Sequence, residues 1–519
     1  MTWMLERERT RFWQWAFAAG LLSLPIAPVL PLVVNVFRGE STIAVWSGAF
    51  RDAIVSSLFL GVGVAAVSLL LGLPLGLLAA LYRFPGRSPL VLVQALPLLL
   101  PSFLPCIGWS NLAAADRLSW LPAPSGFAGC LFVFGLQAVP LSFFATWAAC
   151  RNLTASQIDA ARTHGGERTV LTQTARACVP VVVLAASLAG ILTLSDPGAP
   201  LILGCRSVAV EIRTSFSALY NFNLAGRQCL VLAGLVLVLT LPMLIVGLPS
   251  LATAMLARQT RPAVPYPHRV LSWVAMLGLV SFMTLGMVIP ALGLCLPALE
   301  NPMLGRATEK VGSTIGSTFF YTGGAALVAI SLALCVALVT AGDARLRLFV
   351  LTVLLMLLAF PPALAALGVT SVATDAPPFF DWITRSRLTV ALILGLRFFP
   401  VATVAMMRAV GSLAPSWTDA ALVHGVSRAR RFSRVVVPAL MPGITVGLLL
   451  VMVLSAADIT TTHLLQPPGK PSLPVAIFTV MANSPQGLVA SLCLVYLLSV
   501  TLFLFAASWL PRFWSRRLP

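Results

Sequence analysis

The sequence predicts an all-α integral membrane protein with about twelve transmembrane helices, arranged as two homologous six-helix halves. Of its 519 residues, 59% are hydrophobic and only 10% are charged, whereas a soluble domain is about one quarter charged and less than half apolar. Uncharged runs such as 54–82 and 311–342 exceed the ~20 residues that span a hydrocarbon core. The runs are continuous rather than alternating, which favours helices over a β-barrel.

Twelve uncharged stretches are expected to be membrane helices. In chain order they cover residues 13–36, 54–81, 88–110, 126–149, 179–203, 229–254, 270–297, 313–340, 348–371, 388–410, 436–464 and 487–510. The first is not a secretory signal peptide, because it is too long, lacks a small-residue cleavage site and is followed by many others. The fifth and eleventh are interrupted by Asp196 and Asp458.

The basic residues predict the orientation of the chain in the lipid bilayer. The formal net charge is +18, from 34 Lys and Arg against 16 Asp and Glu. Such residues gather in cytoplasmic loops, so this charge does not indicate nucleic acid as a partner. The side that holds the N-terminus and every second loop carries about twice as many Lys and Arg as the other side. Both termini are therefore expected in the cytoplasm.

An internal repeat relates the two halves at a constant offset of 260 residues. Its longest matches are Gly135-Leu136-x-x-x-Pro140 with Gly395-Leu396-x-x-x-Pro400, and Ser156-x-x-Asp159-Ala160-Ala161-x-x-His164-Gly165 with Ser416-x-x-Asp419-Ala420-Ala421-x-x-His424-Gly425. A two-residue shift later aligns Asp196 with Asp458. Residues 1–257 are thus expected to form the first half, 258–268 a polar, Pro-rich cytoplasmic linker, and 269–519 the second half in parallel orientation.

The same short element stands in the loop between the fourth and fifth helix of each half. A Ser followed three residues later by an Asp has the form of a capping box, an Ala pair follows, and a Gly is expected to end the helix. The residues are Asp159, Ala160, Ala161 and Gly165 in the first copy and Asp419, Ala420, Ala421 and Gly425 in the second. One copy alone would be an ordinary amphipathic connector, but duplication favours a docking element for a partner.

The pattern Asp-Ala-Ala-x-x-x-Gly, followed by Val437-Pro438 in the second copy and by Val179-Pro180 after a longer gap in the first, resembles the cytoplasmic loop signature of permeases of bacterial ABC importers. The usual first residue of that signature is Glu. The resemblance implies a multi-pass permease of the bacterial inner membrane. It also implies that the two loop helices dock into a cytoplasmic ABC ATPase dimer and that a periplasmic binding protein delivers the solute.

The tandem form is similar to the fused permeases of ferric iron, thiamine and phosphonate importers. Residues 194–204, Leu-Ser-Asp-Pro-Gly-Ala-Pro-Leu-Ile-Leu-Gly, look most like the ferric iron group. The resemblance therefore implies ferric iron or a small chelate as the solute. Thiamine, a phosphonate, a polyamine or an oxyanion remain open.

No sequence motif indicates an enzyme or a cofactor on this chain. A phosphate-binding loop requires Gly-x-x-x-x-Gly-Lys-Ser/Thr, but the one Gly-Lys pair, Gly469-Lys470, is followed by Pro471. The four His and nine Cys residues lack metal-ligand spacing, so no metal site is expected. An ion-coupled secondary transporter with six plus six helices is the alternative, although the loop 82–87 lacks the acid expected in the major facilitator type.

Charged residues within the spans are the candidates for a translocation pathway. Asp196 and Asp458 stand near the ends of equivalent spans, and Arg397 lies in the middle of the tenth span, where the repeat places the neutral Gln137 in the first half. A charge inside a span costs roughly 2.5–3.5 kcal/mol on insertion scales and usually faces a bundle interior. Arg397 is expected to face the space between the halves as an off-axis cation, paired with an acid, a carbonyl or water. Asp458 is the nearest acid in its half, and the alternative is snorkelling of Arg397 to the interface.

Overall fold

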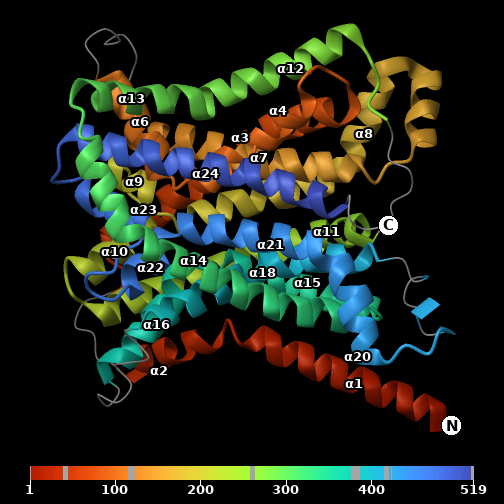
Figure 1. Ribbon diagram of the computed structural model, residues 1–519. Helices are drawn as coiled ribbons and strands as arrows, with labels where there is room; N and C mark the ends of the chain where they lie inside the picture. The colour runs from red at the N-terminus through yellow and green to blue at the C-terminus, as the bar shows by residue number, and fades with distance from the viewer. Residues whose placement is uncertain are drawn as a thin grey trace.

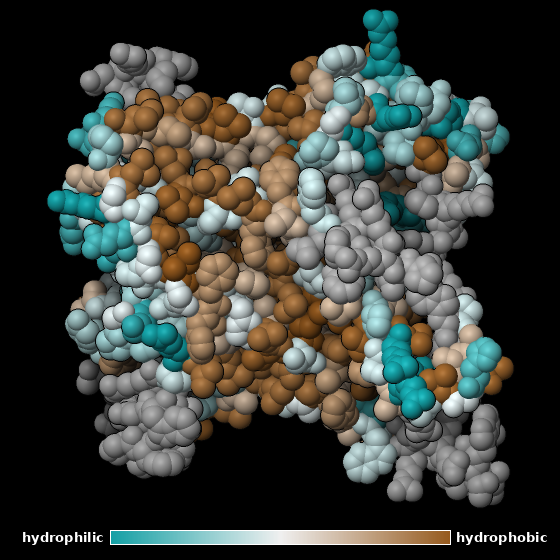
Figure 2. Space-filling model, viewed as in Figure 1, coloured by the Kyte–Doolittle hydropathy of each residue, from teal (hydrophilic) through white to brown (hydrophobic). Residues whose placement is uncertain are grey.

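The computed structural model describes residues 2–38, 45–114, 123–256, 264–375, 386–413, 416, 420–421 and 423–515. Figure 1 shows long helices that run side by side in one direction. In the same view, apolar residues fill the middle of the visible surface and hydrophilic residues gather towards its two ends (Figure 2). The start of α1 (Thr2–Ser23) and the end of α24 (Gln486–Ser515) lie at one end of the bundle, which we call the terminal end.

The described helices agree with the predicted all-α membrane fold. Nine are long and apolar enough to cross a membrane, and three bent pairs raise the number to twelve when each pair is one span. The long spans are α3 (Gly48–Leu81), α7 (Gly126–Cys150), α8 (Ala155–Thr193), α11 (Phe222–Leu256), α12 (Arg269–Met283) with α13 (Ile289–Glu300), α14 (Leu304–Thr340), α18 (Arg387–Gly411), α20 (Arg428–Arg431) with α21 (Val437–Ala457), and α24.

Three of the expected spans are broken helices. The first bends by 44° between α1 and α2 (Leu30–Arg38), and the third bends by 94° between α4 (Arg87–Val93) with α5 (Leu96–Leu99) and α6 (Phe103–Ala113). The ninth bends by 75° between α15 (Ala344–Ala359) and α16 (Pro362–Asp375). Proline stands at each break, and its missing N–H removes a helix hydrogen bond. By contrast, Pro140 and Pro400 lie inside α7 and α18 without ending them.

The fifth and eleventh spans differ most from the expected boundaries. α8 begins in the preceding loop and ends at Thr193, and α21 ends at Ala457. Each is followed by a separate short helix, α9 (Gly198–Leu203) or α22 (Ile459–Leu465). The aspartates cause this division: Asp458, for example, accepts a hydrogen bond from the Thr461 N–H and thereby caps α22. Two further short helices, α10 (Val208–Ser217) and α23 (Leu473–Val480), were not expected from the sequence.

The two halves pack against each other at the broken spans. α6 of the first half packs on α13 of the second, and α16 of the second half packs on α2 of the first. Gly108 in α6 lies so close to Pro290 that a Cβ would overlap the Pro290 carbonyl, and Gly368 in α16 meets Pro28 in the same way. Repeat-related positions therefore make equivalent contacts across the boundary between the halves.

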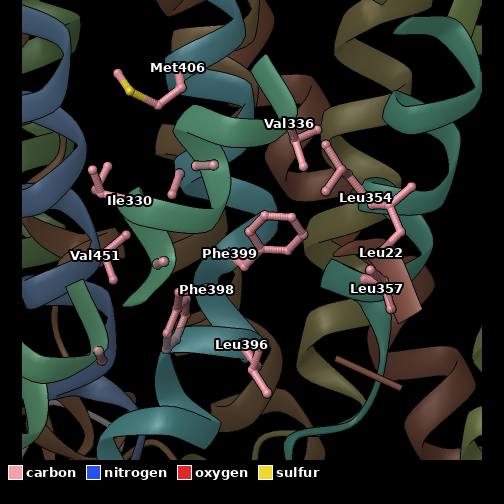
Figure 3. Packing of buried hydrophobic residues seen from close by; sticks show 14 of the residues in the cluster. Leu22, Ile330, Val336, Leu354, Leu357, Leu396, Phe398, Phe399, Met406 and Val451 are labelled. Atoms are coloured by element: carbon pink, nitrogen blue, oxygen red, sulfur yellow. The ribbon is translucent and has the colours of Figure 1, made fainter. Parts of the chain in front are cut away.

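The largest buried cluster joins α14 to α18 in the second half. Figure 3 shows Ile330 and Val336 of α14 with Phe399 and Met406 of α18, alongside Leu354 of α15. All five side chains are buried. Without a hydrophobic driving force between helices in lipid, tight packing of this kind is what holds spans together. The cluster thus gives Arg397, on the same helix as Phe399, a rigid position.

Candidate functional site

One cavity of about 400 Å³ contains all four residues that the sequence nominates for a pathway. Gln137, Asp196, Arg397 and Asp458 line it together. Its other lining residues come from both halves and are mostly apolar, among them Leu98, Leu141, Leu188, Leu192, Leu450, Leu454 and Phe478. The structure therefore brings these polar groups to one space between the halves, inside the apolar belt of the bundle.

Arg397 forms an ion pair with Asp458 at this cavity. The distance between Nε of Arg397 and Oδ2 of Asp458 is 2.5 Å, and the two side chains are 21% and 4% exposed. Nη1 of Arg397 also donates to the Phe360 carbonyl, 3.4 Å away, at the break between α15 and α16. Each charge compensates the other where solvation by water is poor. The pairing that the sequence allowed is present, and Arg397 is not a lone cation.

Gln137 and Asp196 make related contacts in the first half. Nε2 of Gln137 donates to the Leu100 carbonyl at 2.5 Å, and Leu100 precedes Phe360 by the repeat offset. Asp196 Oδ1 accepts from Ser102 Oγ at 2.9 Å and from the Gly198 N–H at 2.7 Å. The Gln137 Oε1 atom is buried and has no hydrogen-bond partner among the described residues. Its acceptor capacity is therefore unused among the described residues.

The charges of the cavity lining come from three groups. Arg397 contributes the positive charge, and Asp196 and Asp458 contribute the carboxylates. Because the ion pair neutralises Arg397, the remaining ionisable group is Asp196, whose carboxyl is held by Ser102. The lining does not form a ring of like charges. It offers few fixed charged partners to a molecule inside the cavity.

The first loop element is a short helical segment at the terminal end. It begins after Thr154, whose Oγ1 accepts from the Gln157 N–H at 3.3 Å, while Gln157 Oε1 accepts from the Thr154 N–H at 3.1 Å. The capping box is therefore formed by Thr154 and Gln157, and its prediction at Ser156 and Asp159 is wrong. Thr154 has the extended backbone that an N-cap requires, whereas the other two residues already lie inside the helix.

The predicted docking residues of this first copy differ in exposure. The Asp159 side chain is 69% exposed, Ala160 is exposed, and Ala161 is buried. The helix is interrupted at Gly165 and Gly166, where both residues leave helical geometry. Gly166, not Gly165, has the positive φ of +64° that favours glycine. Of the predicted docking residues in this copy, Asp159, Ala160 and Gly165 are exposed to a partner, and Ala161 is not.

The second loop element also ends at a glycine of positive φ, one repeat position earlier than in the first copy. Gly425 has φ +67°, and the Val426 N–H donates to the Ala421 carbonyl at 3.0 Å, which is the bond pattern of a glycine-terminated helix. Ala420 is exposed and Ala421 is buried, as are their counterparts in the first copy. Asp419 lies outside the described residues.

The end of the linker contacts the first loop element. The Tyr266 N–H donates to the Leu81 carbonyl at 2.8 Å, and the Arg162 guanidinium stacks over the Tyr266 ring at 4.0 Å. Nε of Arg162 lies 2.6 Å from Oε1 of Glu167, whose Oε2 accepts from the Tyr82 hydroxyl at 2.6 Å. Burial and this bond to Glu167 raise the pKa of Tyr82, so its hydroxyl stays protonated and donates. Sequence reasoning missed this network.

Sequence reasoning also missed Ser102, which holds Asp196. Its signal was available, because Ser102 directly follows the repeated Pro101 at the break of a span. Glu167 follows the Gly165–Gly166 break in the same way. No group of three or more His, Cys, Asp and Glu side chains that could hold a metal ion occurs within the described ranges.

Comparison with known protein families identifies the second half. Residues 326–517 match the family described as binding-protein-dependent transport system inner membrane component. The matched range contains Arg397, Asp458 and the second loop element. Comparison with curated proteins and with solved structures gives no match. Over residues 326–517, the chain therefore carries a domain similar to the inner membrane components of binding-protein-dependent transport systems.

Proposed function

We propose that this chain is the permease subunit of a bacterial ABC importer and that each half supplies one permease domain. The family match over residues 326–517 carries the proposal. The equivalent contacts of Gly108 and Gly368, and of Gln137 and Arg397, extend it to the first half. A single fused chain then replaces two separate permease subunits.

In this proposal the cavity between the halves is the translocation pathway. Its mostly apolar lining, with one ion pair and two buried polar groups, suits a passage that binds its solute weakly. Selectivity then resides in a periplasmic binding protein that docks at the end opposite to the terminal end. The chain has no enzymatic role of its own and requires no cofactor.

The energy comes from a cytoplasmic ATPase dimer that docks at the terminal end. Each ATPase protomer contacts one loop element, at Asp159 and Ala160 in the first half and at Asp419 and Ala420 in the second. Exposed Ala residues allow close approach of a partner surface, and the exposed carboxylate of Asp159 supplies a charge for it. Both termini then lie in the cytoplasm, and the chain lies in the bacterial inner membrane.

For the solute we propose ferric iron or a small iron chelate, on the resemblance of residues 194–204 to the ferric iron permeases. Asp196 belongs to this stretch and lines the cavity. Because Arg397 is neutralised by Asp458, no unpaired cation opposes a metal ion there. Thiamine, a phosphonate, a polyamine and an oxyanion are the alternatives, and ligand binding by the cognate periplasmic protein distinguishes them.

The test is reconstitution of the chain with a candidate ABC ATPase, sought first among the genes adjacent to its own. The importer predicts a stable complex whose ATP hydrolysis rises when the loaded binding protein is added. The alternative, an ion-coupled secondary transporter, is favoured by the buried carboxyl of Asp196 at the cavity. It predicts uptake that a protonophore abolishes and that requires no ATPase, and this result would replace the proposal.

A further inference from the structure

A second pocket lies at the terminal end, away from the central cavity. Its volume is about 250 Å³, and its lining contains three arginines from three different elements. Arg87 begins α4, Arg151 caps the end of α7, and Arg162 lies in the loop element that opens α8. Val264 and Pro265 of the linker form part of the wall, and no Asp or Glu is among the described residues that line the pocket.

Within the described part of the chain, two of these three arginines have no carboxylate partner. Arg162 is compensated by Asp159 and Glu167. The Arg87 guanidinium donates to the backbone carbonyls of Ala79 and Ala80, at 2.7 and 3.4 Å, and these carry no net charge. Among the described residues, neither Arg87 nor Arg151 forms an ion pair. The pocket is therefore electropositive.

Trp147 adds an unused hydrogen-bond donor to the same pocket. The guanidinium of Arg151 lies over its ring, 5.0 Å from the centroid, and Trp147 itself lines the pocket. Its Nε1 atom is buried and has no hydrogen-bond partner among the described residues. A buried donor of this kind normally has a partner, and an anion held by the neighbouring arginines would be able to supply it.

The repeat shows that the fold does not require this arrangement. Arg347 in the second half corresponds to Arg87 and makes the same contacts, donating to the carbonyls of Thr340 and Ala341 at 3.4 and 2.8 Å. However, Gly411 stands where the first half has Arg151, and Met407 where it has Trp147. The arginine at the start of the bent span is thus structural in both halves, while the additional groups are particular to the first.

We propose that the pocket of Arg87, Arg151 and Arg162 binds a phosphate group. The planar fork of a guanidinium matches phosphate oxygens with two parallel hydrogen bonds, and the Trp147 Nε1 supplies a further donor. Both free phosphate in the cytoplasm and the headgroup of an anionic lipid can reach an arginine cluster at the end of a membrane span. The chemistry that the pocket recognises is the same in both cases.

Such a ligand would connect a membrane span to a loop element. Arg151 lies at the end of α7, whereas Arg162 belongs to the segment that contacts the linker at Tyr266. A bound phosphate group would hold these elements together and restrict movement of the first loop element alone. This regulatory consequence rests on the proposed docking of an ATPase, but the binding of phosphate does not.

The test measures binding to the full chain, without any partner. The chain is placed in nanodiscs of zwitterionic phosphatidylcholine, and binding of radiolabelled inorganic phosphate is measured at constant ionic strength with chloride as competitor. A second set of nanodiscs contains phosphatidylglycerol, and the thermal unfolding midpoint is compared between the two lipids. Arg151→Gln removes an exposed cation that forms no ion pair among the described residues, so it should fold normally. Arg347→Gln, at the second-half counterpart of Arg87, is the control for loss of an arginine outside the pocket.

Saturable phosphate binding that falls at least about tenfold in Arg151→Gln and is unchanged in Arg347→Gln supports a site for free phosphate. Stabilisation by phosphatidylglycerol alone, with the same dependence on Arg151, supports a lipid headgroup site. Equal behaviour of wild type and Arg151→Gln in both arms overturns the proposal. An acidic surface of a protein partner would then be the expected ligand of the three arginines. The proposed importer function would be unaffected by this result.

Discussion

The guanidinium of Arg397 lies 2.5 Å from the carboxylate of Asp458, and this ion pair joins the middle of α18 to the break between α21 and α22. The related positions of the first half, Gln137 and Asp196, instead bond to Leu100 and Ser102 on the broken third span. The cavity is thus symmetric in the positions of its polar groups and asymmetric in its charges.

Breaking this ion pair should destabilise the protein. Arg397→Gln leaves the carboxylate of Asp458, which is only 4% exposed, without its cation, and the expected loss is about 3 kcal/mol of unfolding free energy. The double variant Arg397→Gln/Asp458→Asn should recover most of that loss, because no charge remains unpaired. Chemical unfolding in detergent measures both. A single variant as stable as wild type would mean that Arg397 is solvated at an interface.

The contact of Gly108 with Pro290 predicts that a Gly→Ala substitution at this position lowers stability, although such a substitution in a helix usually raises it. Alanine normally stabilises a helix interior by up to about 1 kcal/mol relative to glycine. At Gly108 and Gly368 the added methyl group meets a carbonyl of the other half, so both variants should lower the thermal unfolding midpoint. Gly323→Ala in α14, with open space around it, is the control and should not. Equal midpoints for all three would disprove this close approach.

The glycines that end the loop elements predict that their substitution uncouples ATP hydrolysis from transport. Gly166 and Gly425 have positive φ, so alanine at either position costs roughly 1 kcal/mol of local strain and shifts the end of its helix. Both variants should insert normally and yet lose transport per ATP hydrolysed. Gly234→Ala in α11, where a methyl group meets nothing, is the control. Normal transport by both loop variants, with the ATPase retained, would refute the docking assignment.

The bond between Tyr82 and Glu167 predicts a dependence of stability on alkaline pH. Burial and this bond raise the pKa of Tyr82 in the folded protein, whereas an unfolded tyrosine titrates near pH 10. Above about pH 10 the folded state therefore binds more protons than the unfolded state, and its stability falls. Tyr82→Phe should show a smaller fall over that range. Identical slopes for wild type and Tyr82→Phe would show that the bond contributes nothing.

The sequence predicts the spans well and the breaks in them poorly. Uncharged runs depend on composition alone, so the helices that contain Gln137 and Arg397 were found almost at their observed boundaries. Pro101, Pro140, Pro361 and Pro400 were all expected to break or bend their spans, but the spans break only at Pro101 and Pro361. A proline in an apolar run either bends a helix or is tolerated, and packing decides between the two outcomes.

The candidate cavity was predicted by its residues but not by its contacts. The cost of charge in a membrane was enough to nominate Arg397, Asp196 and Asp458, and the repeat was enough to nominate Gln137. Ser102 and the pocket of Arg87, Arg151 and Arg162 depend on where bent helices and the linker meet. The pocket has no signal in the local sequence, whereas Ser102 had one in its position directly after the repeated Pro101.

The central claim is that the cavity between the halves carries a solute in an ATP-driven importer. The most direct measurement is solute uptake into proteoliposomes that contain the chain with its ATPase and binding protein. Uptake by the wild type is compared with uptake by a variant whose cavity is filled by a large side chain. Ala457→Trp places a large side chain on the cavity lining, and Val238→Trp on the exposed surface of α11 is the control. The account predicts that uptake requires ATP and is abolished by Ala457→Trp alone, with the ATPase still bound. Uptake that continues without ATP, or that Ala457→Trp leaves unchanged, would contradict it.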